Sequence, residues 1–154
     1  MKMIPYWIYL ILFLIIFAIV GIILLKRRSM DKEYQGVLTS IRNFQPSMWY
    51  ENERPFQAEL QGWLKHDFDS KMEVQTGSSR PDMSIHKIAI EVKGPTGSSE
   101  LQTIADKCVR YYQYYKYAIF VLFDPTYNQK YFSDWKAGIK AHFPKAQIIE
   151  IEKK

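Results

Sequence analysis

An uncharged run from Met3 to Leu25 most constrains what this chain can fold into. Its sequence WIYLILFLIIFAIVGIILL is almost wholly apolar, and about 20 such residues in a helix cover the roughly 30 Å hydrocarbon layer of a bilayer. A cleaved signal peptide is the alternative, but its apolar core is usually about 7–15 residues long. This run is longer, and basic residues follow it directly. The sequence therefore predicts an uncleaved transmembrane anchor over residues 1–28.

The charges that flank this run predict its orientation. Basic residues gather between positions 26 and 32, whereas Lys2 and the amino terminus lie on the other side. Because basic flanks stay on the cytoplasmic side, we expect the N-terminus outside and the rest of the chain in the cytoplasm. Tyr6, Trp7 and Tyr9 fit an aromatic belt at the outer interface.

The remaining sequence is long enough for one domain. Residues 29–51 are predicted to form a connector with some helical periodicity, which Pro46 stops, and residues 52–154 to form the compact domain. The single cysteine, Cys108, excludes an intramolecular disulfide. A net charge of +5 permits nucleic acid or anionic lipid as a partner and requires neither.

The domain shows alternating helix and strand signals. An apolar stripe that ends at Trp63 and Leu64 predicts a helix that Asn52 caps. Further helices are predicted from Ser98 or Ser99 to about Tyr115 and over 131–142, and strands at KMEVQT, PDMSI, IAIEVK, YAIFVLF and AQIIEI. The order α, β, β, β, α, β, α, β predicts an α/β or α+β fold with a mixed sheet covered by helices.

The stretch RPDMSIHKIAIEVK places charges within two apolar strands. If His86-Lys87 is the turn between them, position 82 pairs with position 91. Directly paired residues share a face with their Cβ atoms about 4.5–5.5 Å apart. Asp82 and Glu91 are then neighbours, and Lys93 lies one step along the same face.

Two neighbouring carboxylates repel each other unless a proton or a cation lies between them. A divalent ion with oxygen ligands, such as Mg²⁺, resolves this repulsion. A lysine beside the ion can orient or deprotonate a water, which suits metal-assisted hydrolysis of a phosphodiester. A solvated polar face with an incidental Glu–Lys pair is the alternative.

Pro81-Asp82 followed by Glu91-x-Lys93 resembles the signature of the PD-(D/E)xK nuclease superfamily. The segment AELQGWLKHDFDSKMEVQTGSSRPDM is similar to the archaeal Holliday junction resolvase branch, and the resemblance covers roughly residues 53–123. It implies a restriction-endonuclease-like core, a central mixed sheet flanked by helices, here preceded by one transmembrane helix.

The resemblance also implies roles for the motif residues. Asp82 and Glu91 would bind Mg²⁺, for which Mn²⁺ can substitute, and the backbone carbonyl of Val92 would be a further ligand. Lys93 would position the attacking water.

A glutamate of the first helix often completes such sites. Glu59 is the predicted ligand, Glu53 is the alternative, and a solvent-facing Glu59 is also open. Gln102 is a further candidate catalytic residue, since some nucleases of this superfamily place a Gln or Lys on the helix after the motif; a plain polar helix face is the alternative.

Two more segments have open interpretations. Ser78, Ser79 and Arg80 precede the motif and either contact a phosphate or form an ordinary turn. The tyrosine-rich stretch VRYYQYYKYAIF either stacks on unpaired bases or packs against the sheet.

Together these features predict a membrane-anchored, metal-dependent endonuclease that hydrolyses DNA. A catalytically inactive nuclease-fold module that binds nucleic acid or protein at the membrane is the alternative. Dimerisation is common among related nucleases, so a homodimer is also considered. Whether the DNA is duplex, single-stranded or branched, and whether RNA is excluded, stays open.

Overall fold

The computed structural model describes residues 6–152. The chain divides into two compact units, one that runs to Gly36 and one that starts at Val37. The second unit therefore begins within the segment predicted to be a connector.

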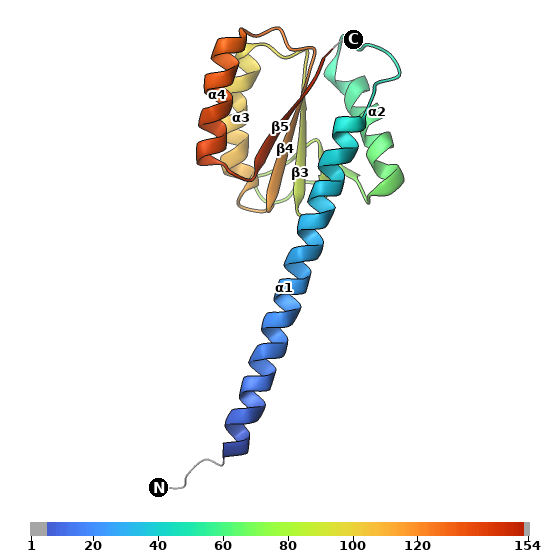
Figure 1. Ribbon diagram of the computed structural model, residues 1–154. Helices are drawn as coiled ribbons and strands as arrows, with labels where there is room; N and C mark the ends of the chain where they lie inside the picture. Colours follow the sequence, from blue (N-terminus) through green and yellow to red (C-terminus); the bar gives the residue numbers. More distant parts are fainter. Residues whose placement is uncertain (1–5, 153–154) are drawn as a thin grey trace. The chain divides into compact units, whose positions relative to one another are not determined.

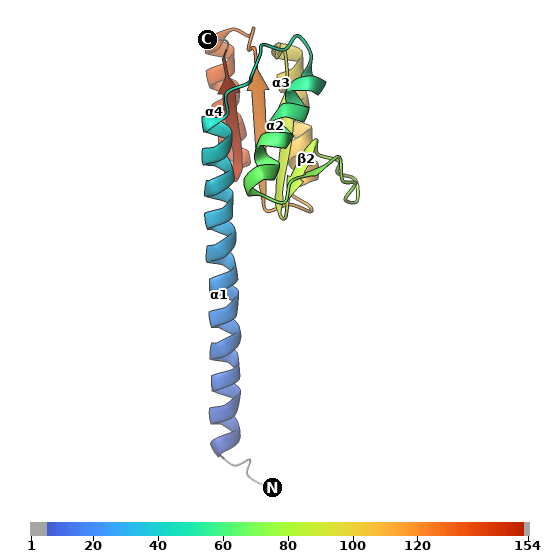
Figure 2. The same ribbon diagram turned by 90° about the vertical axis from the view of Figure 1, so that its right-hand side faces the viewer.

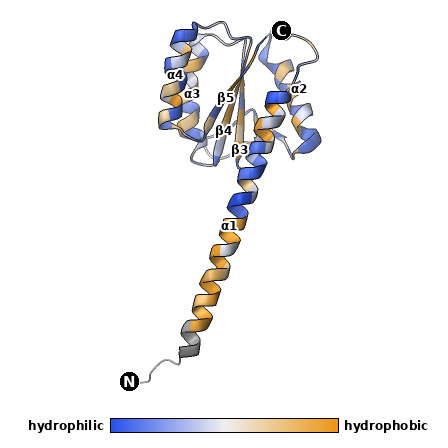
Figure 3. Ribbon diagram, in the orientation of Figure 1, coloured by the Kyte–Doolittle hydropathy of each residue, from blue (hydrophilic) through white to orange (hydrophobic). Residues whose placement is uncertain are grey.

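The first unit consists of most of helix α1 (Tyr6–Asn43). Its apolar side chains from Leu10 to Leu25 are exposed, and hydropathy changes abruptly at the basic residues that follow (Figure 3). By length and composition this helix is able to cross a membrane, and a signal sequence near the N-terminus would have the same properties. Lys2 lies outside the described residues, as do the side chains of Tyr6, Trp7 and Tyr9.

The last turns of α1 belong to the core of the second unit. Val37, Leu38 and Ile41 are buried, which explains the helical periodicity of this segment. Phe44, directly after the helix, packs edge-on against Phe56 with ring centroids 5.7 Å apart. The apolar residues between 37 and 44 therefore belong to the core of the second unit, although they lie in the segment predicted to be a connector.

A five-stranded mixed sheet forms the centre of the second unit. The strands are β1 (Lys71–Met72), β2 (Met83–Ile85), β3 (Ile88–Lys93), β4 (Tyr117–Phe123) and β5 (Ala146–Ile151), and they lie in sequence order. The first two pairings are antiparallel, and β3, β4 and β5 are parallel. The predicted mixed α/β architecture is confirmed at this level.

Helices cover both faces of the sheet (Figure 1). Helices α3 (Ser98–Tyr111) and α4 (Gln129–His142) lie on one face, and α2 (Glu53–Asp67) lies on the other, as Figure 2 also shows. The apolar stripe of α3 packs with alternate residues of the parallel strands, including Ala89, Ala118 and Phe120. On the opposite face, Phe56 of α2 stacks on Phe123 with ring centroids 4.3 Å apart.

Three predicted elements are shorter in the structure. The strand predicted at PDMSI begins only at Met83. The strand predicted at KMEVQT ends at Met72, because Glu73 adopts a positive φ of 46° and turns the chain away from β2. The helix predicted to reach Tyr115 ends at Tyr111, and a tight turn follows in which the Tyr115 amide donates to the Tyr111 carbonyl. This turn allows the chain to enter β4 beside β3.

Candidate functional site

The β2–β3 hairpin has the register expected from the sequence. Ile85 pairs with Ile88 and Ser84 with Ala89 across the His86-Lys87 turn, in which His86 has a positive φ of 46°. The two strands therefore bring position 82 toward the C-terminal end of β3. The motif lies at this end of the sheet, where the N-terminus of α2 also arrives.

Hydrogen bonds hold both the side chain and the backbone carbonyl of Asp82. Its Oδ2 accepts a hydrogen bond of 2.7 Å from the Val92 amide. Its own carbonyl accepts from the Glu73 amide at 3.0 Å and from the Gln57 side chain at 3.4 Å. These bonds fix the half-buried carboxylate beside β3. Val92 thus takes part through its amide, and a ligand role for its carbonyl stays a prediction.

Glu91 is the most deeply buried charge of the motif, with a side chain 0% exposed. Its Oε1 lies 3.0 Å from Lys93 Nζ and also contacts Lys107 Nζ. Its Oε2 accepts a hydrogen bond from the Tyr111 hydroxyl. Because a buried carboxylate is costly unless it is paired and hydrogen-bonded, these three donors offset the cost of burying Glu91.

The glutamate of α2 that reaches the motif is Glu53. Both of its oxygens lie 3.3 Å from Lys93 Nζ, and Oε2 accepts from the Gly94 amide at 3.4 Å. Glu59, the predicted ligand, instead accepts a 2.8 Å hydrogen bond from the Ser47 amide in the segment before α2. The structure therefore brings the alternative, Glu53, to the motif. The reason is position: Glu53 is in the first turn of α2, which meets the end of β3.

Helix α3 supplies two contacts to the motif that the sequence did not predict. Gln102 is exposed on α3, whereas Lys107 and Tyr111 reach Glu91. The available signal was the buried stripe of α3, formed by Leu101, Ile104, Cys108 and Tyr111. Lys107 borders this stripe one turn before Tyr111, on the side that faces the sheet.

Burial shifts the pKa values of both Lys107 and Tyr111. Burial lowers the pKa of Lys107, and the nearby carboxylates of Asp82 and Glu53 oppose that shift. Burial also raises the pKa of Tyr111, with a further contribution from Asp82. Tyr111 is therefore a neutral hydrogen-bond donor to Glu91 at physiological pH.

The loop before the motif is tied to α3. The hydroxyl of buried Ser79 donates to the Arg110 carbonyl at 2.8 Å, and the Ser78 amide donates to the Tyr114 hydroxyl at 3.4 Å. Arg80 is exposed and forms an ion pair with Glu73. Ser79 thus has a structural role, which favours the ordinary-turn interpretation of this loop.

The tyrosine-rich stretch packs mainly inside the fold. Tyr111, Tyr115 and Tyr117 are buried. The Tyr115 hydroxyl also lies 3.1 Å from Thr76 Oγ1, within hydrogen-bonding distance. These contacts favour packing over base stacking for the three buried rings.

The motif offers the right kind of ligand atom for a hard divalent cation, but these atoms are not arranged to hold one. Asp82, Glu91 and Glu53 offer oxygen ligands of the kind that Mg²⁺ prefers. Among residues 6–152, however, no group of three or more His, Cys, Asp or Glu side chains is arranged to hold a metal. Two lysine ammonium groups instead lie at Glu91 Oε1. A metal could bind these carboxylates only if one of the two ammonium groups moved away from Glu91.

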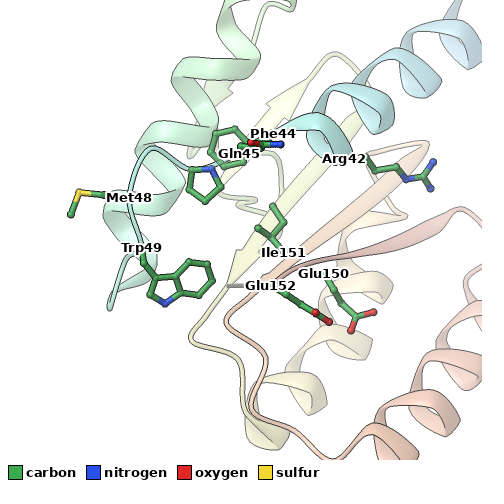
Figure 4. Close-up of a pocket in the computed structure, with 9 residues that line it drawn as sticks. Arg42, Phe44, Gln45, Met48, Trp49, Glu150, Ile151 and Glu152 are labelled. Carbon is green, nitrogen blue, oxygen red and sulfur yellow. The ribbon is translucent and has the colours of Figure 1, made fainter. Parts of the chain in front are cut away.

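A cavity of about 400 Å³ lies at the end of β5 (Figure 4), at the same edge of the parallel strands as the end of β3. It is lined by residues of the segment after α1, including Phe44, Met48 and Trp49, and by the end of β5. The Glu150 carboxylate in its wall is already bound at 3.0 Å by both the Tyr127 hydroxyl and Lys136 Nζ. The cavity shares no residue with the motif.

Comparison with known proteins adds no relative. No family model, no curated protein and no solved structure matches this chain.

Proposed function

We propose that this protein is a membrane-anchored, Mg²⁺-dependent nuclease of the PD-(D/E)xK type that hydrolyses phosphodiester bonds of DNA. The observation that carries the proposal is the convergence of Asp82, Glu91 and Lys93 at the end of β3. Asp82 is fixed to the Val92 amide at 2.7 Å, and Lys93 lies 3.0 Å from Glu91. The proposal includes a restriction-endonuclease-like fold, which the mixed sheet and its flanking helices support.

Each residue has a definite task in this proposal. Asp82 and Glu91 would hold the ion, with Glu53 at the edge of the site. Bound Mg²⁺ would supply Lewis-acid stabilisation of the charge that develops on the phosphate. The Lys93 side chain is 15% exposed, so its ammonium group would orient a water that enters from solvent. Glu53 holds that ammonium on its other side.

The test uses the full chain in detergent micelles with linear duplex, single-stranded and four-way-junction DNA and with RNA. Each substrate is incubated with Mg²⁺, Mn²⁺ or EDTA. We expect metal-dependent cleavage that falls at least about 100-fold in Asp82→Asn and in Lys93→Met, in line with the loss of a ligand or a positioned proton donor. Asp134→Asn and Lys140→Met make the same chemical changes at exposed positions of α4 and should cleave normally.

One observation favours the non-catalytic alternative. Both oxygens of Glu91 already have protein donors, so this carboxylate needs no metal to satisfy its hydrogen bonding. A nuclease-fold module that binds nucleic acid without cutting it would have such a carboxylate. Saturable DNA binding with no cleavage under any metal condition would select this alternative and reject the enzyme.

We also propose that α1 anchors the protein, with its N-terminus outside and the second unit in the cytoplasm. The exposed apolar surface of Leu10 to Leu25 and the basic residues from Lys26 support this placement. Protease protection in sealed vesicles tests it: the C-terminal unit should be cleaved only where the cytoplasmic face is accessible. A homodimer stays a prediction, which sedimentation of the detergent-solubilised chain would test.

A further inference from the structure

We propose that Lys107 is a built-in counter-ion that occupies the cation position at Glu91 and leaves it when a divalent ion binds. This inference rests on the proposed function, because it concerns the same carboxylates. It adds a residue outside the sequence motif that sets how tightly the site takes a metal.

The crowding at one oxygen is the first observation. Lys93 and Lys107 both contact Oε1 of Glu91, although one ammonium group is enough to balance its charge. Three carboxylates, those of Asp82, Glu91 and Glu53, face these two ammonium groups. The cluster therefore has one more negative group than positive groups. A divalent ion that bound while both lysines stayed in place would leave the cluster with an excess of positive charge.

Of the three partners of Glu91, Lys107 is the one most free to leave. Lys93 is held from the other side by Glu53 at 3.3 Å. Tyr111 is fixed because its ring stacks on Phe120 with centroids 6.3 Å apart. Lys107 has a flexible four-carbon stem and a side chain 21% exposed, so its ammonium can move outward into water.

The displacement has a clear electrostatic consequence. An ammonium at Glu91 repels an incoming divalent ion at close range and competes for the same oxygen. Removing the charge of Lys107 should therefore strengthen metal binding. A purely structural Lys107 predicts the reverse, because the site would lose its shape together with the residue.

The experiment titrates Mn²⁺ into the full chain in detergent micelles and follows free Mn²⁺ by electron paramagnetic resonance. We expect Lys107→Met to bind at least about tenfold more tightly than the wild type, which corresponds to about 1.4 kcal/mol. Lys107→Arg, which keeps the charge, and Lys140→Met, which removes an exposed charge from α4, should bind like the wild type. Circular dichroism checks that each variant is folded.

A second measurement needs no variant. Reductive methylation of the wild-type chain, read out residue by residue by mass spectrometry, reports the exposure of each lysine. Lys107 should react several-fold faster with Mn²⁺ than without it, and Lys140 should react at the same rate in both. Equal labelling of Lys107 in both conditions would overturn the inference, as would unchanged or weaker Mn²⁺ binding in Lys107→Met.

The outcomes separate this inference from the proposed function. Tighter Mn²⁺ binding in Lys107→Met without any DNA cleavage would support the counter-ion role and reject the nuclease. Cleavage that needs Asp82 and Lys93, with unchanged Mn²⁺ affinity in Lys107→Met, would do the opposite. Absence of Mn²⁺ binding in every variant would overturn the inference, whatever the cleavage assay shows.

Discussion

The carboxylate oxygens of Glu53 both lie 3.3 Å from the ammonium nitrogen of Lys93, although 40 residues separate the two in the chain. This contact joins the start of α2 to the end of β3. It makes the first turn of α2 part of the charged cluster and leaves the middle of that helix outside it.

The two glutamates of α2 should therefore behave differently on mutation. We expect Glu53→Gln to weaken Mn²⁺ binding and cleavage by about tenfold, since partners of this kind orient the residues that meet the metal. Glu59→Gln should change both by less than about twofold, because Glu59 contacts Ser47 instead. Mn²⁺ titration and the DNA cleavage assay measure both effects. Equal losses in the two variants would contradict the assignment of Glu53.

Glu59 should matter for stability in a pH-dependent way. Partial burial opposes its ionisation, but hydrogen bonds from the Ser47 amide and from the Tyr50 and Ser47 side chains outweigh this and lower its pKa below 4.5. A lowered pKa in the folded state stabilises the fold above the unfolded pKa, and this stabilisation is lost as pH falls through the folded pKa.

Urea denaturation at several pH values tests this point. Glu59→Gln should be less stable than the wild type by about 1 kcal/mol at pH 7. The difference should shrink below pH 4.5. Glu51→Gln changes an exposed glutamate before α2 and should stay within about 0.5 kcal/mol of the wild type at pH 7. A constant difference across the pH range would rule out the hydrogen-bonded carboxylate as its cause.

The hairpin and its charges could be predicted from sequence because strand alternation and a two-residue turn determine the pairing. Asp82, Glu91 and Lys93 are set by local rules that need no knowledge of the rest of the chain. Glu53 and Lys107 could not be selected in this way. Their contacts depend on how α2 and α3 pack against the sheet. The sequence alone does not show which of several polar residues on each helix reaches the motif.

Tyr111→Phe should destabilise the protein because it leaves Oε2 of buried Glu91 without the hydroxyl donor. We expect a loss of about 1–3 kcal/mol in the free energy of unfolding. Urea denaturation measures it. Tyr131→Phe removes an exposed hydroxyl from α4 and should stay within about 0.5 kcal/mol of the wild type. Equal stability of Tyr111→Phe and the wild type would show that Glu91 finds another donor.

Cys108 should be unreactive in the folded protein. Burial raises the pKa of its thiol to about 12, so almost no thiolate is present at pH 8. Iodoacetamide labelling followed by mass spectrometry should therefore be slow in buffer and fast in urea. A Gln102→Cys substitution adds an exposed thiol to the same helix, and that thiol should be labelled quickly in both conditions. Rapid labelling of Cys108 in buffer would indicate that α3 detaches from the sheet.

The two-residue turn at His86-Lys87 restricts how this chain can change length. One added residue there would invert the inward and outward sides of one strand relative to the other, so Asp82 would point away from Val92 while every residue of the motif was still present. Two added residues would preserve the pairing. Length variation among descendants of this sequence should therefore be even at this hairpin and unrestricted in parity in the exposed residues 73–75.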